Sequence, residues 1–343
     1  MNRAILRREA TGLLACLLAL GGVATVPAPA TGTTTAPAPA GAIQEFEPVG
    51  VAIEPIRVTE RVYYVRGEAG MVSTENEGFN SNAGFVITDD GVVVFDALGT
   101  PALGAALLEA IRALTQQPVR RVIVSHYHSD HFYGVQAFKA AGAEIWADEG
   151  VRPYLGTEAP AARLAERRES LWPWVNEASR IVAPDRYLSG TTRFSLGGID
   201  FTVLPAGPAH TNEDIMLLVE QESVLFAGDV MFAGRVPFVG DADSRAWLAA
   251  LDRLAEISPR HVIVGHGPHS DDAPADIDLT RRYLRYLRQT MGAAIEDLET
   301  FEEVYDRTDW SAFADLPAFE AANRGNAYNT YLLMQREALQ AGE

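Results

Sequence analysis

Two kinds of hydrophobic pattern alternate along the chain, and together they predict a mixed α/β domain. Short β-branched or aromatic runs bordered by Gly, Asp and Asn predict strands within residues 61–67, 82–97, 121–126, 143–148, 193–206, 214–229 and 261–267. Three of these runs contain an internal turn, at residues 89–91, 197–198 and 221–223. Each of the three therefore predicts a β-hairpin.

Apolar residues at helical spacing separate the strand runs. They predict helices within residues 101–116, 132–141, 151–169 and 244–257, and Thr100 before Pro101 is typical of a helix start. Because hairpins are mixed with helices, the order favours layered sheets flanked by helices over a simple parallel β-α-β series. From about residue 276 onward only helical patterns remain, so residues 276–343 predict a helical extension.

The first thirty residues have the pattern of a secretory signal peptide. Arginines precede an apolar run, and Ala28 and Ala30 offer a small-residue cleavage site. Glycines interrupt this run, which is shorter than the roughly 20 residues that a membrane span needs. Cleavage and export are therefore favoured over a membrane anchor. The export route can be either the general secretory (Sec) pathway or the twin-arginine pathway. Residues 31–56 are rich in Pro, Ala and Thr and predict a linker.

Composition limits the partners and the compartment. The formal charge of -18 disfavours nucleic acid and anionic lipid as partners, so we expect a small-molecule substrate. The predicted signal peptide places the protein in the periplasm or outside the cell, without stable membrane insertion after cleavage. The oligomeric state stays open. Cys16, the only cysteine, lies in the predicted signal peptide. The mature protein would then have no thiolate for a metal, so a metal site must use histidine and carboxylate.

Three of the seven histidines and one aspartate crowd into residues 126–131, directly after an apolar strand run. His126 and His128 are two residues apart, so in an extended segment they project the same way and can converge on one ion. Asp130 and His131 can turn toward a second ion. A single histidine pair is more often structural. This density of ligands at a strand end, where α/β proteins place their sites, indicates metal binding.

Three further polar residues close apolar strand runs in a similar way. His210 follows the run at 201–209, Asp229 follows the run at 223–228, and His266 follows the run at 261–265. Each alone has an ordinary interpretation as a loop, turn or strand-end residue. With the first cluster they make five histidines and two aspartates, which suit two zinc-like ions. His261 and His269 are left over and expected at the surface.

The H-x-H-x-D-H string at residues 126–131, with His210, Asp229 and His266 after it, resembles the metallo-β-lactamase superfamily of binuclear hydrolases over residues 57–275. The resemblance implies an α/β fold, an αββα sandwich with the metals at one edge of its two sheets, here with a C-terminal helical extension. It implies two Zn²⁺ ions. The implied ligands are His126, His128 and His210 for the first ion, Asp130, His131 and His266 for the second, and Asp229 as the bridge.

Asp96, at the end of a strand run, is implied by the same resemblance as a residue that orients the imidazoles, with a plain turn aspartate as the alternative. The bridging Asp229 weighs against a dedicated β-lactamase and favours the branches of glyoxalase II-like thioesterases, lactonases and phosphodiesterases. The exported, helix-tailed arrangement most resembles periplasmic zinc hydrolases of the quinoprotein-relay type. Persulfide dioxygenases share the H-x-H-x-D-H string but use one iron, so iron stays open.

The implied activity is hydrolysis of a small ester, thioester or lactone by a metal-bound hydroxide, with weak β-lactam hydrolysis as a side activity. Asp229 and Asp130 are the catalytic candidates, Asp229 as the bridge and Asp130 as a proton shuttle. Two alternatives remain: a mononuclear iron enzyme similar to persulfide dioxygenases, and a metal-bearing binding protein without turnover.

Substrate-contact candidates carry weaker signals. They are the polar loop 67–81, the loop 234–241, the aromatic segment 171–177 with Trp172 and Trp174, and residues 326–331 in the tail. No basic cluster similar to the glutathione clamp of glyoxalase II is evident in the sequence.

Overall fold

The computed structural model describes residues 46–240 and 242–341. The predicted signal peptide, residues 1–30, and residues 31–45 of the predicted linker lie outside the described residues. Within the described ranges, none of the helices combines the length and the apolar character that a transmembrane span requires.

A seven-stranded sheet forms one inner layer, with the strands in sequence order from one edge to the other. The first four strands pair antiparallel, and the last four pair parallel. The strands are β1 (Ile56–Arg57), β2 (Val62–Val65), β3 (Ala83–Thr88), β4 (Gly91–Phe95), β5 (Val119–Ile123), β6 (Glu144–Asp148) and β7 (Arg186–Leu188).

A five-stranded sheet in the order β12-β11-β10-β9-β8 forms the second inner layer. Its strands are β8 (Thr192–Leu196), β9 (Ile199–Pro205), β10 (Ile215–Val219), β11 (Val224–Phe232) and β12 (His261–His266). Only the β11–β12 pair is parallel. The three predicted hairpins are confirmed as β3–β4, β8–β9 and β10–β11.

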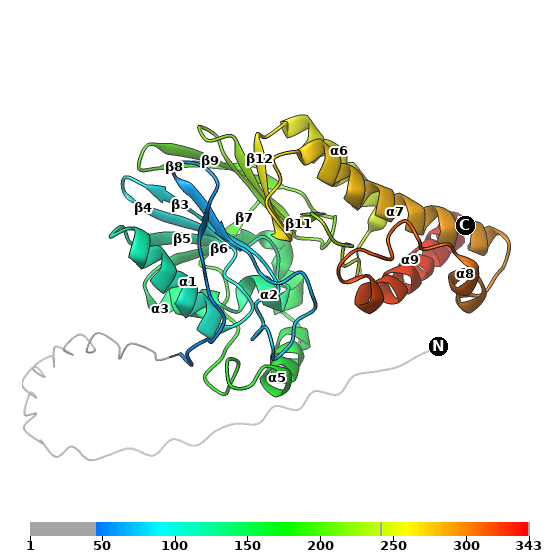
Figure 1. Ribbon diagram of the computed structural model, residues 1–343, viewed down its shortest axis with the longest axis horizontal. Coiled ribbons are helices and arrows are strands. Elements are labelled where there is room, and N and C mark those ends of the chain that lie inside the picture. Colours follow the sequence, from blue (N-terminus) through cyan, green and yellow to red (C-terminus); the bar gives the residue numbers. More distant parts are fainter. Residues whose placement is uncertain (1–45, 241, 342–343) are drawn as a thin grey trace, which may run out of the picture. The chain divides into compact units, whose positions relative to one another are not determined.

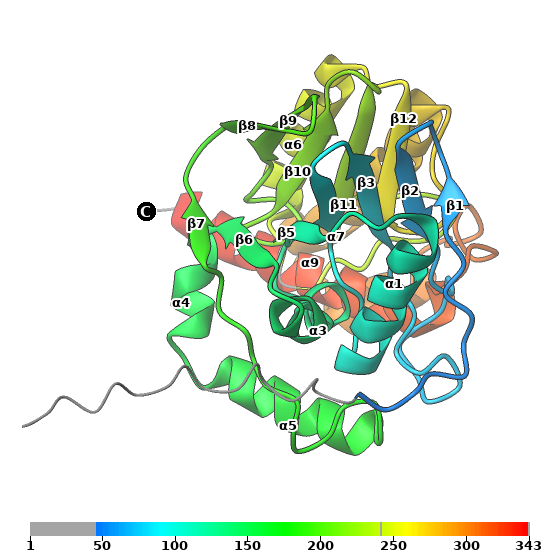
Figure 2. The same ribbon diagram turned by 90° about the vertical axis from the view of Figure 1, so that its left-hand side faces the viewer.

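Helices cover the outer face of each sheet, which confirms the predicted αββα sandwich (Figures 1 and 2). Helices α1 (Pro101–Leu114) and α3 (Val135–Ala140) pack on the first sheet, and α6 (Ser244–Ile257) and α7 (Ala273–Glu296) pack on the second. The apolar faces of the two sheets meet in a core that includes Phe95 and Phe226, whose ring centroids are 5.5 Å apart.

The predicted helix at 244–257 matches α6, but two other predicted helices are interrupted. Residues 151–169 divide into the short helices η1 (Glu149–Val151) and α4 (Arg152–Leu155) and the longer α5 (Ala159–Ser170), because the chain turns at Gly156. The predicted helix at 132–141 divides at Gly134 into α2 (Ser129–Phe132) and α3. Strands β1 and β7 are two and three residues long, too short to show a pattern.

The predicted C-terminal helices are present and share the core of the second sheet. α7 is followed by α8 (Phe301–Arg307), which starts with a capping box between Thr300 and Glu303, and by α9 (Phe319–Ala341). Val230 of β11, Leu251 of α6 and Tyr331 of α9 belong to one buried cluster. The extension is therefore packed onto the domain through apolar contact.

Gly104 of α1 and Gly134 let three backbone segments pack closely together: α1, the segment after β4 and the end of the histidine-rich segment. This contact fixes the position of the histidine-rich segment. A β-carbon on Gly134 would lie 1.8 Å from the carbonyl oxygen of Ala97, and one on Gly104 would lie 2.3 Å from the carbonyl oxygen of Gly134. Across this contact the Ala97 N–H donates to the His131 carbonyl at 2.8 Å, and the Gly134 N–H donates to the Leu98 carbonyl at 3.1 Å.

We predict that Gly134→Ala lowers the free energy of unfolding by about 1–3 kcal/mol, because the added methyl group has no room. Urea denaturation measures this change. Gly325→Ala in α9 is the control, since nothing lies within 4 Å of its new β-carbon. There we expect no loss, or a gain of about 0.5–1 kcal/mol from helix propensity. Equal stability of Gly134→Ala and the unaltered protein would contradict the packing argument.

Candidate metal centre

The structure brings all seven predicted ligand side chains together at one edge of the two sheets. The first sheet contributes His126 and His128 from the segment after β5, and Asp130 and His131 from α2. The second sheet contributes one residue from each of three places: His210 after β9, Asp229 within β11 and His266 at the end of β12. The four histidines outside α2 thus lie at or after a strand end. Asp229 does not, because β11 continues to Phe232, beyond the strand end that the sequence pattern predicts at residue 229.

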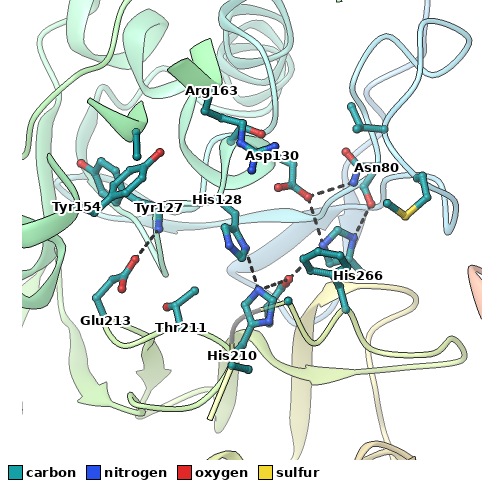
Figure 3. A pocket seen from close by; sticks show the side chains of 18 of the residues that line it. Asn80, Tyr127, His128, Asp130, Tyr154, Arg163, His210, Thr211, Glu213 and His266 are labelled. Carbon is teal, nitrogen blue, oxygen red and sulfur yellow. Dashed lines mark hydrogen bonds and ion pairs between the residues drawn. The ribbon is translucent and has the colours of Figure 1, made fainter. Parts of the chain in front are cut away.

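His126, His128 and His210 form the first group. The Nδ1 atom of His128 lies 3.1 Å from Nε2 of His126 and 2.9 Å from Nε2 of His210. Three ring nitrogens facing one point at this spacing resemble the donor set of an ion with metal–nitrogen distances of about 2.0–2.1 Å. Figure 3 shows His128 and His210 directed toward each other at the centre of the pocket.

Asp130, His131 and His266 form the second group, whose ligand atoms all lie within 4.8 Å of one another. The Oδ2 atom of Asp130 is 3.4 Å from Nε2 of His266 and 3.8 Å from Nε2 of His131. Both groups have the membership that the resemblance implies.

Asp229 lies between the two groups. Its Oδ1 atom is 3.3 Å from Nε2 of His131, and its Oδ2 atom is 3.3 Å from Nε2 of His266 and 3.4 Å from Nε2 of His210. One carboxylate therefore faces ligand atoms of both groups, as a bridging residue must.

The unsatisfied atoms in this cluster fit a bound cation. Among the described residues, the buried Nε2 of His131 and Oδ1 of Asp229 have no hydrogen-bond partner. An unpaired buried polar atom costs about 1–3 kcal/mol, and a cation between the two would satisfy both. Imidazole nitrogen and carboxylate oxygen suit zinc and similar divalent metals.

Hydrogen bonds behind the ligands fix which nitrogen of His126 and His131 faces inward, whereas the outer Nδ1 of His210 has no partner among the described residues. Oδ2 of Asp96 is 2.9 Å from Nδ1 of His131 and accepts from the Ser125 hydroxyl at 2.8 Å. The same hydroxyl is 2.9 Å from Nδ1 of His126. Asp96 thus lies where the sequence analysis expects it. The part played by Ser125 was missed, since a serine beside a ligand carries no signal of its own.

Asn80, from the loop 67–81, supports the second group. Its backbone carbonyl oxygen is 2.6 Å from Nδ1 of His266, and its side-chain Nδ2 donates to Oδ2 of Asp130 at 3.1 Å. Behind it, the buried guanidinium of Arg235 lies 3.4 Å from Nδ1 of His266 and donates to the Gly70 carbonyl at 3.3 Å. The sequence indicated only the loops that carry these two residues.

Burial and neighbouring charges shift the pKa values of the ligand side chains in different directions. Burial lowers the pKa of His210 to about 3 and, together with nearby imidazoles, holds the pKa of His126 well below its ordinary value. Burial alone would raise the pKa of Asp229, but His266 and His131 outweigh it and hold that pKa well below its usual range. The carboxylates of Asp229, Asp130 and Asp96 likewise outweigh burial at His131 and raise its pKa to about 10. A cation bound there would take the place of that proton.

A pocket of about 770 Å³ opens over the cluster. Its wall includes Met71 and Val72 of the loop 67–81, Phe238 of the loop 234–240, and Asn329 of α9. Three of the four candidate substrate segments thus reach it, although Asp241 lies outside the described residues. Figure 3 shows Asp130 and His266 at one side of the pocket and Tyr154 and Glu213 at the other.

The fourth candidate segment is wrong. Trp172 and Trp174 are not among the described residues that line the pocket. Trp172 is 58% exposed, and the Trp174 indole donates to the Pro48 carbonyl at 3.3 Å. The leftover histidines also lie elsewhere: His261 and His269 both face Asp271, at 2.6 and 3.5 Å.

Basic residues line the pocket, although the sequence shows no basic cluster. Arg163 and Arg167, one turn apart on α5, and Arg235 all contribute to the wall. Arg163 pairs with Glu166 at 3.1 Å, and Arg167 donates to the Ser129 hydroxyl at 3.2 Å. They were missed because α5 and the loop 234–240 are distant in sequence and meet only in the fold.

The comparison with protein families agrees with this geometry. Residues 76–266, more than half of the chain, match the family model described as the metallo-beta-lactamase superfamily. The chain belongs to this superfamily. The resemblance found in the sequence is thereby confirmed, and the His/Asp cluster lies within or at the end of the matched segment.

Two alkylsulfatases are among the proteins that are similar to the chain. A linear primary-alkylsulfatase of Pseudomonas sp. is 21% identical over 210 residues, which cover 52% of this chain and 40% of that protein. The solved sec-alkylsulfatase Pisa1 of Pseudomonas sp. has a TM-score of 0.64 at 17% identity and covers 81% of this chain and 50% of its own. The chain therefore spans about half the length, or less, of these two relatives.

The metallo-beta-lactamase FIM-1 of Pseudomonas aeruginosa, solved in its mono-zinc form, has a TM-score of 0.55 at 19% identity. The match covers 68% of this chain and 96% of that structure. At these identities the solved structures support the fold alone.

We predict that Asp229→Asn lowers the amount of metal bound per chain by about half or more, because an amide bridges two cations poorly. Elemental analysis of purified protein measures this change. His261→Gln is the matched control, since His261 faces Asp271 away from the cluster, and it should keep the metal content of the unaltered protein. An Asp229→Asn protein with its full metal content would rule out the bridging role.

Proposed function

We propose that the protein is an exported binuclear metal-dependent hydrolase of small esters, thioesters or lactones, with zinc as its metal. One observation carries the proposal: two groups of three ligands face each other across the shared carboxylate of Asp229, at the floor of an open pocket. A single-ion site would need only one of these groups. The membership in a superfamily with hydrolase members supports the reaction class.

Bound divalent ions would supply a Lewis acid and lower the pKa of water to about 7, so that the site needs no separate strong base. The residues of the chain would hold the ions in place and transfer protons beside them. Asp229 spans the two groups. Asp130 contacts His266 and Asn80 through Oδ2 and lines the pocket, which leaves its second oxygen to accept or return a proton.

The similar alkylsulfatases and β-lactamases, and the arginines that line the pocket, add substrate classes to be tested. The alkylsulfatases suggest sulfate esters beside carboxylic esters, thioesters and lactones, and the β-lactamases suggest β-lactam rings as weak substrates. Arg163 and Arg167 favour substrates that carry an anionic group. The iron dioxygenase and the binding protein without turnover remain the alternatives.

We also propose export to the periplasm or beyond with cleavage of residues 1–30, a small-molecule substrate and no nucleic-acid partner. The acidic charge of -18 supports the last two points. The mature N-terminus, sequenced from protein recovered from the periplasmic fraction, tests the export.

The decisive experiment combines metal analysis with a substrate panel. Protein purified from its native compartment should contain about two zinc ions per chain and hydrolyse at least one ester, thioester, lactone or sulfate ester. A chelator should remove activity, and zinc should restore it. One iron per chain with oxygen consumption on persulfides would favour the dioxygenase. Two zinc ions without turnover across the panel would favour the binding protein.

We predict that Arg163→Gln raises KM for a carboxylate-bearing substrate by about twofold to fivefold relative to a neutral substrate of the same size, as expected for loss of one exposed charge. Steady-state kinetics on the two substrates measures the ratio. Arg112→Gln is the matched control, because Arg112 also pairs with a glutamate three residues away on a helix but lies outside the pocket wall. Equal KM changes for the two substrates would show that Arg163 does not contact the anionic group.

A further inference from the structure

The loop 234–240, between β11 and α6, places one apolar ring over the candidate metal centre. The Phe238 ring centroid is 6.3 Å from that of His128 and 6.4 Å from that of His210. Phe238 is 39% exposed and lines the pocket, whereas Val236 and Val239 on either side are buried. The loop thus anchors itself through two valines and presents the phenyl ring to whatever enters the pocket.

A single side chain from the C-terminal extension holds this loop. Oδ1 of Asn326 in α9 accepts from the Val239 N–H at 2.8 Å, and its Nδ2 donates to the Pro237 carbonyl at 2.7 Å. The two contacts bracket Phe238 in the sequence. A third loop contact comes from the segment before α9, where the Pro317 carbonyl accepts from the Val236 N–H at 3.2 Å.

The carboxamide of Asn326 has its hydrogen-bonding groups engaged. Its second amide hydrogen points to the Tyr283 hydroxyl at 2.9 Å, and that hydroxyl donates to Oδ1 of Asn323 at 2.9 Å. Asn326 is 1% exposed, so each of these bonds is shielded from water. The donor at Val239 and the acceptor at Pro237 also fix which end of the amide carries the oxygen.

The backbone turns at both ends of the loop that these contacts, the Asn326 clamp, hold. Gly234 and Gly240 have φ values of +65° and +50°, a left-handed conformation that changes the chain direction at both ends. The loop therefore leaves the path of β11 before it reaches Phe238. The position of the ring then depends on the burial of Val236 and Val239 and on the two hydrogen bonds from α9.

We propose that Asn326 is a positioning residue which holds Phe238 over the His126/His128/His210 group, so that the C-terminal extension selects substrates with an apolar group beside the scissile bond. This inference rests on the proposed hydrolase function. Phe238 would contact the substrate, and Asn326 would act through it.

The kinetic test compares p-nitrophenyl phenylacetate with p-nitrophenyl acetate, which differ by one phenyl ring on the acyl side. Phe238→Ala and Asn326→Ala should each raise KM for the phenylacetyl ester by about tenfold, and change KM for the acetyl ester by less than about twofold. The metal content should stay near that of the unaltered protein, because neither residue is a predicted ligand. In the Phe238→Ala background, Asn326→Ala should add no further change in KM.

Hydrogen exchange tests the clamp without any turnover. In Asn326→Ala the amide of Val239 should exchange with solvent at least about tenfold faster than in the unaltered protein. Asn323→Ala is the matched control, because Asn323 is equally buried on α9 but contacts Tyr283 and Tyr305 instead of the loop. It should leave the exchange of residues 234–240 unchanged. If Asn326→Ala does not fold, Asn326→Ser replaces it in both tests.

The two tests separate failure of the clamp from failure of the hydrolase proposal. Faster exchange of Val239 with no turnover of either ester would leave the clamp standing and count against esterase activity. Unchanged exchange in a folded Asn326 variant would overturn the clamp. Equal KM changes for the two esters, or additive KM changes in the double variant, would overturn the role of Asn326 in selectivity.

Discussion

The centre depends on one constraint: a buried imidazole presents one nitrogen to a metal in a fixed direction when a partner holds its other nitrogen, as at His131 and His266. Asp96 holds Nδ1 of His131, and the Asn80 carbonyl holds Nδ1 of His266. These outer partners orient the rings and fix their tautomers. Without them, buried imidazoles beside two carboxylates could turn to form ion pairs and close the gap that a cation needs. The ligand cage therefore extends one layer into β4 and the loop 67–81.

Neither sheet contains a complete ligand group. The first group needs His210 from the second sheet, and the second group combines Asp130 and His131 with His266 from β12. Distances between ligand atoms are thus set by how the two sheets pack, through contacts such as that between Phe95 and Phe226. A protein interior is close-packed, so a small displacement of one sheet would be transmitted to the cage. Stability and metal geometry are coupled in this way.

The strand ends were predictable from sequence because they carry local signals. Apolar runs followed by His126 and His266 place these two residues at one edge of the sheets once the sandwich is assumed. The run before Asp229 predicts a strand end there, but β11 continues to Phe232. Ser125, Asn80 and Arg235 were not predictable, since their roles come from partners distant in the chain. The tryptophans at 172 and 174 show the opposite error: aromatic residues suggested a pocket wall, but the segment packs elsewhere. Local pattern predicts elements, and long-range contact assigns roles.

The reaction chemistry and the choice of substrate depend on different parts of the pocket, the floor with its ligands and the surrounding walls. The superfamily match includes the floor of the pocket and the walls formed by α5 and the loop 234–240, whereas the wall formed by α9 lies outside it. The matched segment ends at residue 266, before α9 begins. Membership in the superfamily therefore supports the cage, and the wall that α9 contributes has to be explained from this chain alone. An arginine pair on one wall and a phenyl ring on another favour a substrate that is anionic at one end and apolar at the other.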